Sequence, residues 1–345
     1  MSSVRIFAKP ALSVEQQVAH LKSRGLAVAD EIAAARNLRA IGFFRFCGYA
    51  LPWRQGVDGT KNPAFSSGAC FEDIVDVADF DRKLRTHLLE AIERIEVAVR
   101  AAFSNTLGAN DGAHWFADPS RFRTGHDHPR LIDRIKHEIG FDARNKLKRD
   151  DSIRDYLANY DQPELPPTWI VFEVLSLGTV SRIYENLVPS RQKIIAKEIG
   201  VNRGLLASWL EVVTVMRNYC AHHARIWNRH FPVKPELPNA FHPYFRRTVT
   251  NKHNAVVVEI GDFKLHTQIF VIVKLLELIN DNSQWVDRLF DLLESHPKVD
   301  RIAMGFPSHW TGYPTDTEMA ELIEKEKAGK RLLQASSRTN PLQQG

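Results

Sequence analysis

The chain has 345 residues, of which 44% are hydrophobic and 25% charged, and its formal net charge is +5. This composition is typical of an ordinary globular protein with one large domain or two modest ones. A net charge this small for the length permits a nucleic-acid partner but does not require one.

Cysteine usage and hydropathy exclude several classes of protein. Cys47, Cys70 and Cys220 contain no Cys-x-x-Cys pair and provide no disulfide framework, which fits a reducing compartment best. The N-terminal residues MSSVRIFAKP lack the apolar segment of a signal peptide. No apolar run approaches the roughly 20 residues that a membrane helix needs. We therefore expect a cytoplasmic protein without a membrane segment.

Helix signals dominate the start of the chain. Ser13 opens the capping-box pattern Ser-Val-Glu-Gln, the next apolar residues recur at helical spacing, and Gly25 ends the run. A second short helix is expected from Asp30 to Ile41. The aromatic stretch that follows, IGFFRFCGYALPW, is compatible with either a turn of helix or a short extended piece. Residues 54–69 are predicted to form a polar, glycine-rich loop.

The longest helical pattern runs from Phe71 to Leu107, and Gly108 is expected to end it. Its apolar face repeats every three or four residues, at Val77, Phe80, Leu84, Leu88, Ala91, Ile95, Ala98 and Ala102. The opposite face is charged and is predicted to be a solvated surface formed by Asp81, Arg82, Arg85, Glu90, Glu93 and Arg94.

The second half of the chain is also predicted to be mainly helical. Helices are expected at about 168–187, 189–200, from Asn202 onward, 263–279 and 283–294. Between Arg121 and Asp150, nine Lys or Arg accompany five Asp or Glu, so most of the charge excess lies there. AVVVEIG has the pattern of one short strand, but no convincing partner strand is found.

These elements predict an all-α protein. We expect three parts: an N-terminal helical segment over residues 1–60, a main helical domain over 61–300, and a charged, partly disordered tail over 301–345.

The most unusual stretch is RNYCAHHARIWNR, which begins at Arg217. If the preceding helix continues to its end, one helix face carries Asn218, His222, Arg225 and Arg229. An ordinary surface helix more commonly carries Glu and Lys pairs, so these residue types favour a functional surface. A structural role stays open as an alternative, because His and Arg near a helix C-terminus also stabilise the helix. Trp227 would then belong to the core.

Two other kinds of site are less well supported by the spacing. His222 and His223 are adjacent, so on a helix they point about 100° apart, and no carboxylate accompanies them. His126 and His128 form a His-x-His pair in an expected loop without further ligands. Cys220 is near His223 but continues the apolar series of the helix, which favours buried packing over a nucleophile. We expect no bound metal and no cofactor.

Taken together, these residues resemble a known family. Arg217, Asn218 and His222 match the Arg-Asn-x-x-x-His form of the HEPN motif, and the longer string is similar to the Abi-like abortive-infection family of bacteria. The resemblance continues, in the same order, through KPALSVEQQVAHLKSRGL, IGFFRFCGY, the segment Phe71–Arg100 and PPTWIVFEVLSLGTVSRIYENL. It spans roughly residues 8–295.

The resemblance implies a HEPN-type helical bundle with N-terminal and C-terminal helical extensions. Many HEPN proteins are metal-independent endoribonucleases that act as homodimers with a composite site, and some relatives are associated with a small noncoding RNA. The resemblance therefore implies antiphage defence by RNA cleavage, with RNA as the partner. Because some HEPN proteins only bind RNA, a non-catalytic RNA-binding or phage-sensing module is the alternative.

The motif residues suit metal-free RNA cleavage, since RNA carries its own nucleophile, the 2′-hydroxyl. His222 can act as base or acid, Arg217 can hold the phosphate, and Asn218 can orient either group. Weaker candidates for RNA binding or support of the site are His223, Arg225, Trp227, Asn228 and Arg229. The basic stretch 121–149 is a candidate RNA-binding surface, and the long-helix residues Glu93, Arg94 and Glu96 are candidates to face the site. For both regions, an ordinary solvated surface is the alternative.

Overall fold

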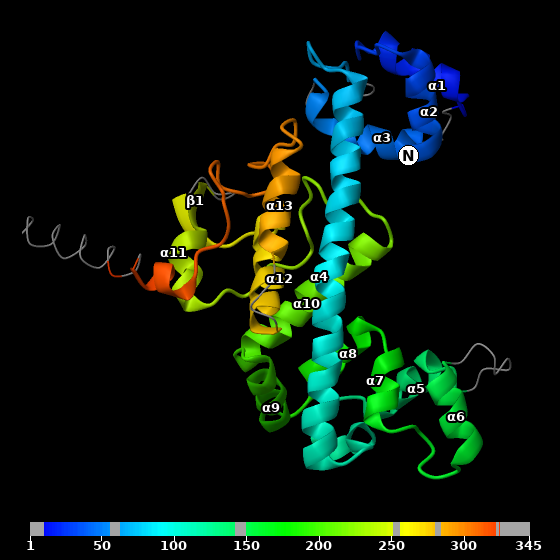
Figure 1. Cartoon of the computed structure of the whole chain (residues 1–345), viewed down its shortest axis with the longest axis vertical. Coiled ribbons are helices and arrows are strands. Elements are labelled where there is room, and N and C mark those ends of the chain that lie inside the picture. The colour runs from blue at the N-terminus through cyan, green and yellow to red at the C-terminus, as the bar shows by residue number, and fades with distance from the viewer. Residues whose placement is uncertain are drawn as a thin grey trace, which may run out of the picture. The chain divides into compact units, whose positions relative to one another are not determined.

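The computed structural model describes residues 10–55, 63–141, 150–250, 256–279, 284–321 and 324. These residues are predominantly α-helical and contain one two-stranded sheet, which confirms the all-α prediction (Figure 1). The α-helices are α1 (Val14–Ser23), α2 (Glu31–Ile41), α3 (Phe43–Tyr49), α4 (Phe71–Asp111), α5 (His128–Glu138), α6 (Asp151–Asn159), α7 (Thr168–Val174), α8 (Leu177–Asn186), α9 (Pro189–Ile199), α10 (Arg203–Ala221), α11 (His242–Phe245), α12 (Leu265–Ile279) and α13 (Trp285–Glu294). The strands are β1 (Arg246–Thr250) and β2 (Val256–Ile260).

The chain divides into two compact units. The first holds residues up to Leu84 together with Asp291–Asp300, and the second holds Arg85–Phe290 and the residues from Arg301 onward. Helix α4 therefore begins in the first unit and ends in the second. The Arg217–Arg229 stretch lies entirely in the second unit.

In the first unit, the aromatic stretch that the sequence left undecided forms α3. The Phe46 ring stacks on Phe71 with 4.5 Å between ring centroids, and Tyr49 is fully buried. The Tyr49 hydroxyl donates a hydrogen bond to the Asp81 carboxylate at 2.5 Å. Asp81 is 0% exposed, so the predicted solvated position of this residue is wrong. Its hydrogen-bond donor, Tyr49, lies on α3, 32 residues earlier in the chain. The residue spacing along α4 carries no signal of this contact.

The core of the second unit is built around α12. Almost the whole of this helix is buried, and it packs against α9 and α10. Its His266 side chain lies among aromatic rings from the segment that follows α13, with 4.9 Å between ring centroids to both Phe306 and Tyr313. Residues 301–321 of the expected tail thus contribute buried side chains, including Trp310. The remainder of that tail, apart from residue 324, lies outside the described residues.

Helix starts follow the sequence signals closely. The Ser13 capping box is present, and Asp30 and Asn202 cap α2 and α10 through their side chains. The predicted end of the long helix at Gly108 is wrong, because α4 continues to Asp111. A Cβ atom at Gly108 would lie 3.2 Å from the Thr168 Cγ2, so this glycine serves the close approach of α7 rather than a helix end.

The AVVVEIG strand has a partner that the sequence analysis missed. β2 pairs antiparallel with β1, in the register Arg246↔Ile260 to Thr250↔Val256. The sequence of β1, RRTVT, lacks an apolar run, and β-branched residues supply its strand preference instead.

We find no single helix, within the described ranges, that is both long and apolar enough to cross a membrane. Helices α9 and α10 are long and apolar enough only when taken together, and their axes are bent by 73° at the break between them.

Candidate functional site

Helix α10 is anchored by a buried apolar face. Trp209, Val213, Met216 and Cys220 are at most 2% exposed, and the helix packs against α8, α9 and α12. This face continues to Cys220, whose complete burial agrees with packing rather than nucleophilic catalysis. The polar residues of the motif are thus presented at the last turn of a firmly packed helix.

The helix ends at Ala221, so the prediction that it continues through Arg229 is wrong. His222 is the C-cap, and His223 adopts a left-handed conformation with φ 54°. The His223 N–H donates to the Cys220 carbonyl at 3.0 Å and the Ala224 N–H donates to the Tyr219 carbonyl at 2.9 Å. These two bonds form a Schellman motif, which ends a helix by satisfying its last carbonyls.

The early end changes the surface expected from helical spacing. Arg225 and Arg229 lie beyond the helix and cannot share a helical face with Asn218 and His222. Asn228 also lies outside α10, seven residues beyond Ala221, and has φ 45°.

The three residues expected to be catalytic occupy different environments. Arg217 is partly buried, while Asn218 and His222 are exposed. His222 lies five positions after Arg217, which places the two about 140° apart around the helix axis. Asn218 and His222 are one helical turn apart and therefore lie on one side of α10. A ligand that contacts both Arg217 and His222 must extend around the end of the helix.

Arg217 and Ala221 line an open pocket of about 390 Å³ together with residues of α4. The lining residues from α4 are Leu89, Ile92, Glu93, Glu96, Val97 and Arg100. Glu93 and Glu96 thus face the pocket that contains Arg217, which is one of the two alternatives that the sequence left open. Val97 is 54% exposed, so one wall of the pocket is an accessible apolar surface.

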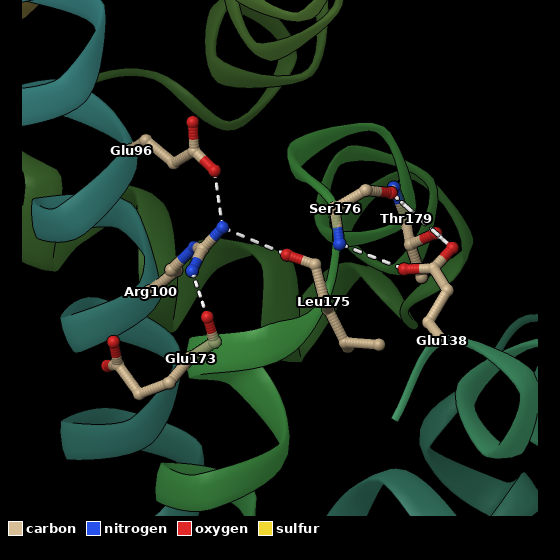
Figure 2. A network of polar contacts seen from close by, with 7 residues as sticks. All are labelled: Glu96, Arg100, Glu138, Glu173, Leu175, Ser176 and Thr179. Atoms are coloured by element: carbon tan, nitrogen blue, oxygen red, sulfur yellow. Dashed lines mark hydrogen bonds and ion pairs between the residues drawn. The ribbon is translucent and has the colours of Figure 1, made fainter. Parts of the chain in front are cut away.

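Arg100 connects this pocket to the corner between α7 and α8 (Figure 2). Its guanidinium pairs with Glu96 and donates to the main-chain carbonyls of Glu173 and Leu175, the latter at 2.9 Å. These carbonyls belong to the end of α7, where Arg100 acts as a cap. Its side chain is only 14% exposed, so the interaction is largely shielded from water.

The other side of the same corner is held by Glu138 from the end of α5 (Figure 2). Its carboxylate accepts hydrogen bonds from the Ser176 N–H at 2.8 Å and from the Thr179 hydroxyl at 2.6 Å. Ser176 is the N-cap of α8, so the carboxylate lies at the positive end of that helix. Arg100 and Glu138 together fix the α7–α8 corner beside the pocket.

The segment after α10 is tied back to the helices on both sides. The Arg85 guanidinium of α4 donates to the Ala224 carbonyl at 3.5 Å. The Arg229 guanidinium lies 4.4 Å from the centre of the Tyr219 ring and donates to the Arg225 carbonyl at 3.1 Å. Arg85 is 7% exposed, so its predicted place on a solvated surface is wrong, because it anchors a loop that lies 139 residues further along the chain.

Trp227 packs in the core of this segment. It is 1% exposed, and it therefore offers no open ring face on which a base could stack. Its burial holds the loop that carries His223, Arg225 and Asn228 against the body of the second unit. His222 and His223 are both exposed, and neither ring has a hydrogen-bond partner within the described residues.

The charge around the motif is one-sided. Between Glu211 and Glu236 the sequence contains four Lys or Arg and three His, but no Asp or Glu. The nearest carboxylates across the pocket come from α4, and one of these, Glu96, is paired with Arg100. The exposed surface at the end of α10 is therefore suited to an anionic ligand.

The basic stretch that begins at Arg121 is largely neutralised where the structure describes it. Arg121 pairs with Asp111 and Asp118, and Lys136 pairs with Glu164. Most of its excess charge belongs to residues 142–149, which lie outside the described residues. Over the described ranges, no group of three or more His, Cys, Asp or Glu side chains is arranged to hold a metal ion.

Arg100 lines the Arg217 pocket but was not among the predicted site residues. Its spacing of four residues from Glu96 was the available signal, because such pairs meet on a helix. The contacts of Arg100 with α7 have no signal in the sequence, since their partners are carbonyl groups.

Comparison with known proteins gives one result. A family model described as Abi-like protein matches residues 36–228, which is more than half of the chain and includes the motif up to Asn228. Residues 8–35 and 229–295, where the resemblance was also expected, lie outside this match. Neither curated proteins nor solved structures gave a match. The chain therefore belongs to the Abi-like protein family.

Proposed function

We propose that this protein is a metal-independent endoribonuclease of the HEPN superfamily. Membership of the Abi-like family suggests abortive-infection defence, and RNA cleavage is the activity that we assign to that role. The observation that carries the proposal is the end of α10, where an exposed Asn218 and His222 adjoin a pocket containing Arg217. That surface lies in a run of 24 residues without a single carboxylate.

The chemistry needs only the RNA and these side chains. A base removes the proton of the 2′-hydroxyl, and the 2′-oxygen attacks the adjacent phosphorus. The bond from phosphorus to the 5′-oxygen breaks, and that oxygen takes a proton from an acid. His222 is assigned one of these proton transfers, and Arg217 stabilises the negative charge that develops on the phosphate. The products are a 2′,3′-cyclic phosphate and a 5′-hydroxyl.

Asn218 is assigned the task of orienting the His222 ring or a phosphate oxygen, because it lies one turn earlier on the same side of α10. Arg225 remains a proposed contact for the RNA backbone near the scissile phosphate. Arg229 contacts the Tyr219 ring and the Arg225 carbonyl, so we assign it the role of a loop anchor rather than of a phosphate ligand.

We further propose that the active form is a homodimer in which two motifs approach each other. The accessible Val97 and Ala221 at the pocket give the surface an apolar component that a second copy can cover. An associated noncoding RNA fits the same cationic surface. A non-catalytic RNA-binding module is the second candidate. The exposure of both histidines, without partners among the described residues, argues against a purely structural role of the motif.

End-group analysis tests the reaction directly. A labelled single-stranded RNA is incubated with the full-length protein in EDTA, beside the same RNA carrying 2′-deoxyribose at the mapped cleavage position. The proposal expects cyclic phosphate and 5′-hydroxyl ends, and no cleavage at the deoxy position. Ends with a 5′-phosphate, or continued cleavage at the deoxy position, would refute attack by the 2′-oxygen.

A further inference from the structure

His223 occupies a backbone position that is suited to glycine. It is the residue after the C-cap of α10, and its φ of 54° lies in the left-handed region. Helices commonly end in this way with glycine, which lacks the Cβ atom that makes this conformation costly. In the described part of the chain, the positive-φ residues other than glycine are His223 and Asn228.

No side-chain contact with the described residues explains a histidine here. The side chain is exposed, so it fills no core space, and its ring makes no hydrogen bond with another described residue. Sparsely populated backbone conformations are concentrated at functional sites, where the side chain has to be presented in a particular place. A buried ring and a hydrogen-bonded ring, two ordinary explanations for a histidine at a helix end, are both absent at His223.

Asn228 provides a contrast within the same loop. It has a similar φ of 45°, and asparagine adopts this conformation because its short polar side chain can hydrogen-bond locally. Its side chain is partly buried, unlike that of His223. Asn228 is therefore explained by the turn that it makes.

We propose that His223 is the second proton carrier of the ribonuclease site, a proposal that rests on the function proposed above. His222 and His223 then act as a pair within one chain. One neutral ring takes the proton of the 2′-hydroxyl as the bond from the 2′-oxygen to phosphorus forms. The other ring, protonated, gives its proton to the 5′-oxygen as the bond from phosphorus to that oxygen breaks. The net charge of the pair is unchanged.

The geometry allows both rings to reach one phosphodiester. Adjacent Cα atoms are about 3.8 Å apart, and the Schellman turn makes the chain change direction at His223. Arg85 from α4 binds the Ala224 carbonyl beside this turn, and Arg217 lies in the last turns of α10. The α4 carboxylates that line the Arg217 pocket are those of Glu93 and the paired Glu96.

The test is the pH dependence of cleavage by the full-length protein in EDTA. The variants are His223→Asn and His223→Gly, with His309→Asn, an exposed histidine outside the motif, as control. Asparagine and glycine both adopt the left-handed conformation, so both variants are expected to keep the fold, with melting temperatures no lower than that of the wild type. Neither replacement can transfer a proton. We expect the wild type to show a bell-shaped profile, and both His223 variants to lose one limb and about 10²–10⁴-fold in rate.

The outcomes separate this proposal from the proposed function. Loss of one limb in the His223 variants, with an unchanged profile for His309→Asn, supports the assignment. A wild type that cleaves, with His223 variants that keep both limbs and differ only in KM, overturns the proton-transfer role while the ribonuclease function stands. A wild type that does not cleave RNA overturns both. A melting temperature of His223→Gly below that of the wild type overturns the inference from the backbone.

Discussion

The buried His266 predicts a specific loss of stability in acid. The side chain is 4% exposed among aromatic rings, and burial lowers its pKa from 6.5 to about 3, against a smaller opposing effect of the Asp262 carboxylate. Because the pKa is depressed in the folded state, the unfolded chain binds the extra proton between these two values. Stability is therefore complete above about pH 6.5 and is lost as the pH falls toward 3.

The magnitude follows from the two pKa values of His266. At pH 5 the unfolded histidine is protonated and the folded one is neutral, so the free energy of unfolding falls by about 2 kcal/mol relative to pH 8. His266→Gln removes the titrating group and keeps an acceptor near the Tyr244 hydroxyl, which lies 3.4 Å from the His266 Nε2.

Urea unfolding at pH 8 and at pH 5 measures the effect. The wild type is expected to lose about 2 kcal/mol more than His266→Gln between these pH values. The exposed His137→Gln serves as the control and is expected to follow the wild type. Equal losses for the wild type and His266→Gln would show that protonation of His266 does not cause the loss of stability in acid. Because protonation of His266 also destabilises the fold in acid, a loss of cleavage at low pH must be compared with unfolding measured at the same pH.

Two further predictions concern the motif. Arg217→Lys keeps the charge but loses the bidentate fork, so the single-turnover cleavage rate is expected to fall about tenfold to a hundredfold, and an unchanged rate would exclude Arg217 from the reaction. Trp227→Ala removes a side chain that is 1% exposed, so thermal or urea unfolding is expected to show a loss of about 3–5 kcal/mol. A change near zero for Trp227→Ala would mean that this ring is accessible to a base after all.

The helix starts were predictable because their signals are local. Ser13, Asp30 and Asn202 each cap a helix through a side chain that hydrogen-bonds within three residues. The apolar series of α10 likewise predicted that Cys220 is buried. These features need no knowledge of distant parts of the chain.

The end of α10 was not predictable in the same way. The usual signals, glycine just after the helix or proline soon after it, are absent, and His223 takes the left-handed position instead. The error extended the helix by eight residues and placed Arg225 and Arg229 on a face that does not exist. His223, which stands where a helix end usually has glycine, was therefore the hardest residue of the motif to predict and the most informative one.

Buried charges were missed for a different reason. Asp81 and Arg85 alternate with other charged residues on α4, which is the pattern of a solvated face. Their partners, the Tyr49 hydroxyl and the Ala224 carbonyl, lie 32 and 139 residues away along the chain. Long-range hydrogen bonds of this kind depend on tertiary packing and leave no periodic trace in the sequence.

The most direct test of the account is cleavage of one labelled single-stranded RNA, in EDTA, by the wild type and His222→Ala. The exposed histidine variant His309→Ala serves as the matched control. If His222 transfers a proton in the reaction, the wild type and the control cleave at the same positions. His222→Ala then stays folded and loses about 10²–10⁴-fold in rate. Cleavage by His222→Ala at the wild-type rate would contradict this role of His222.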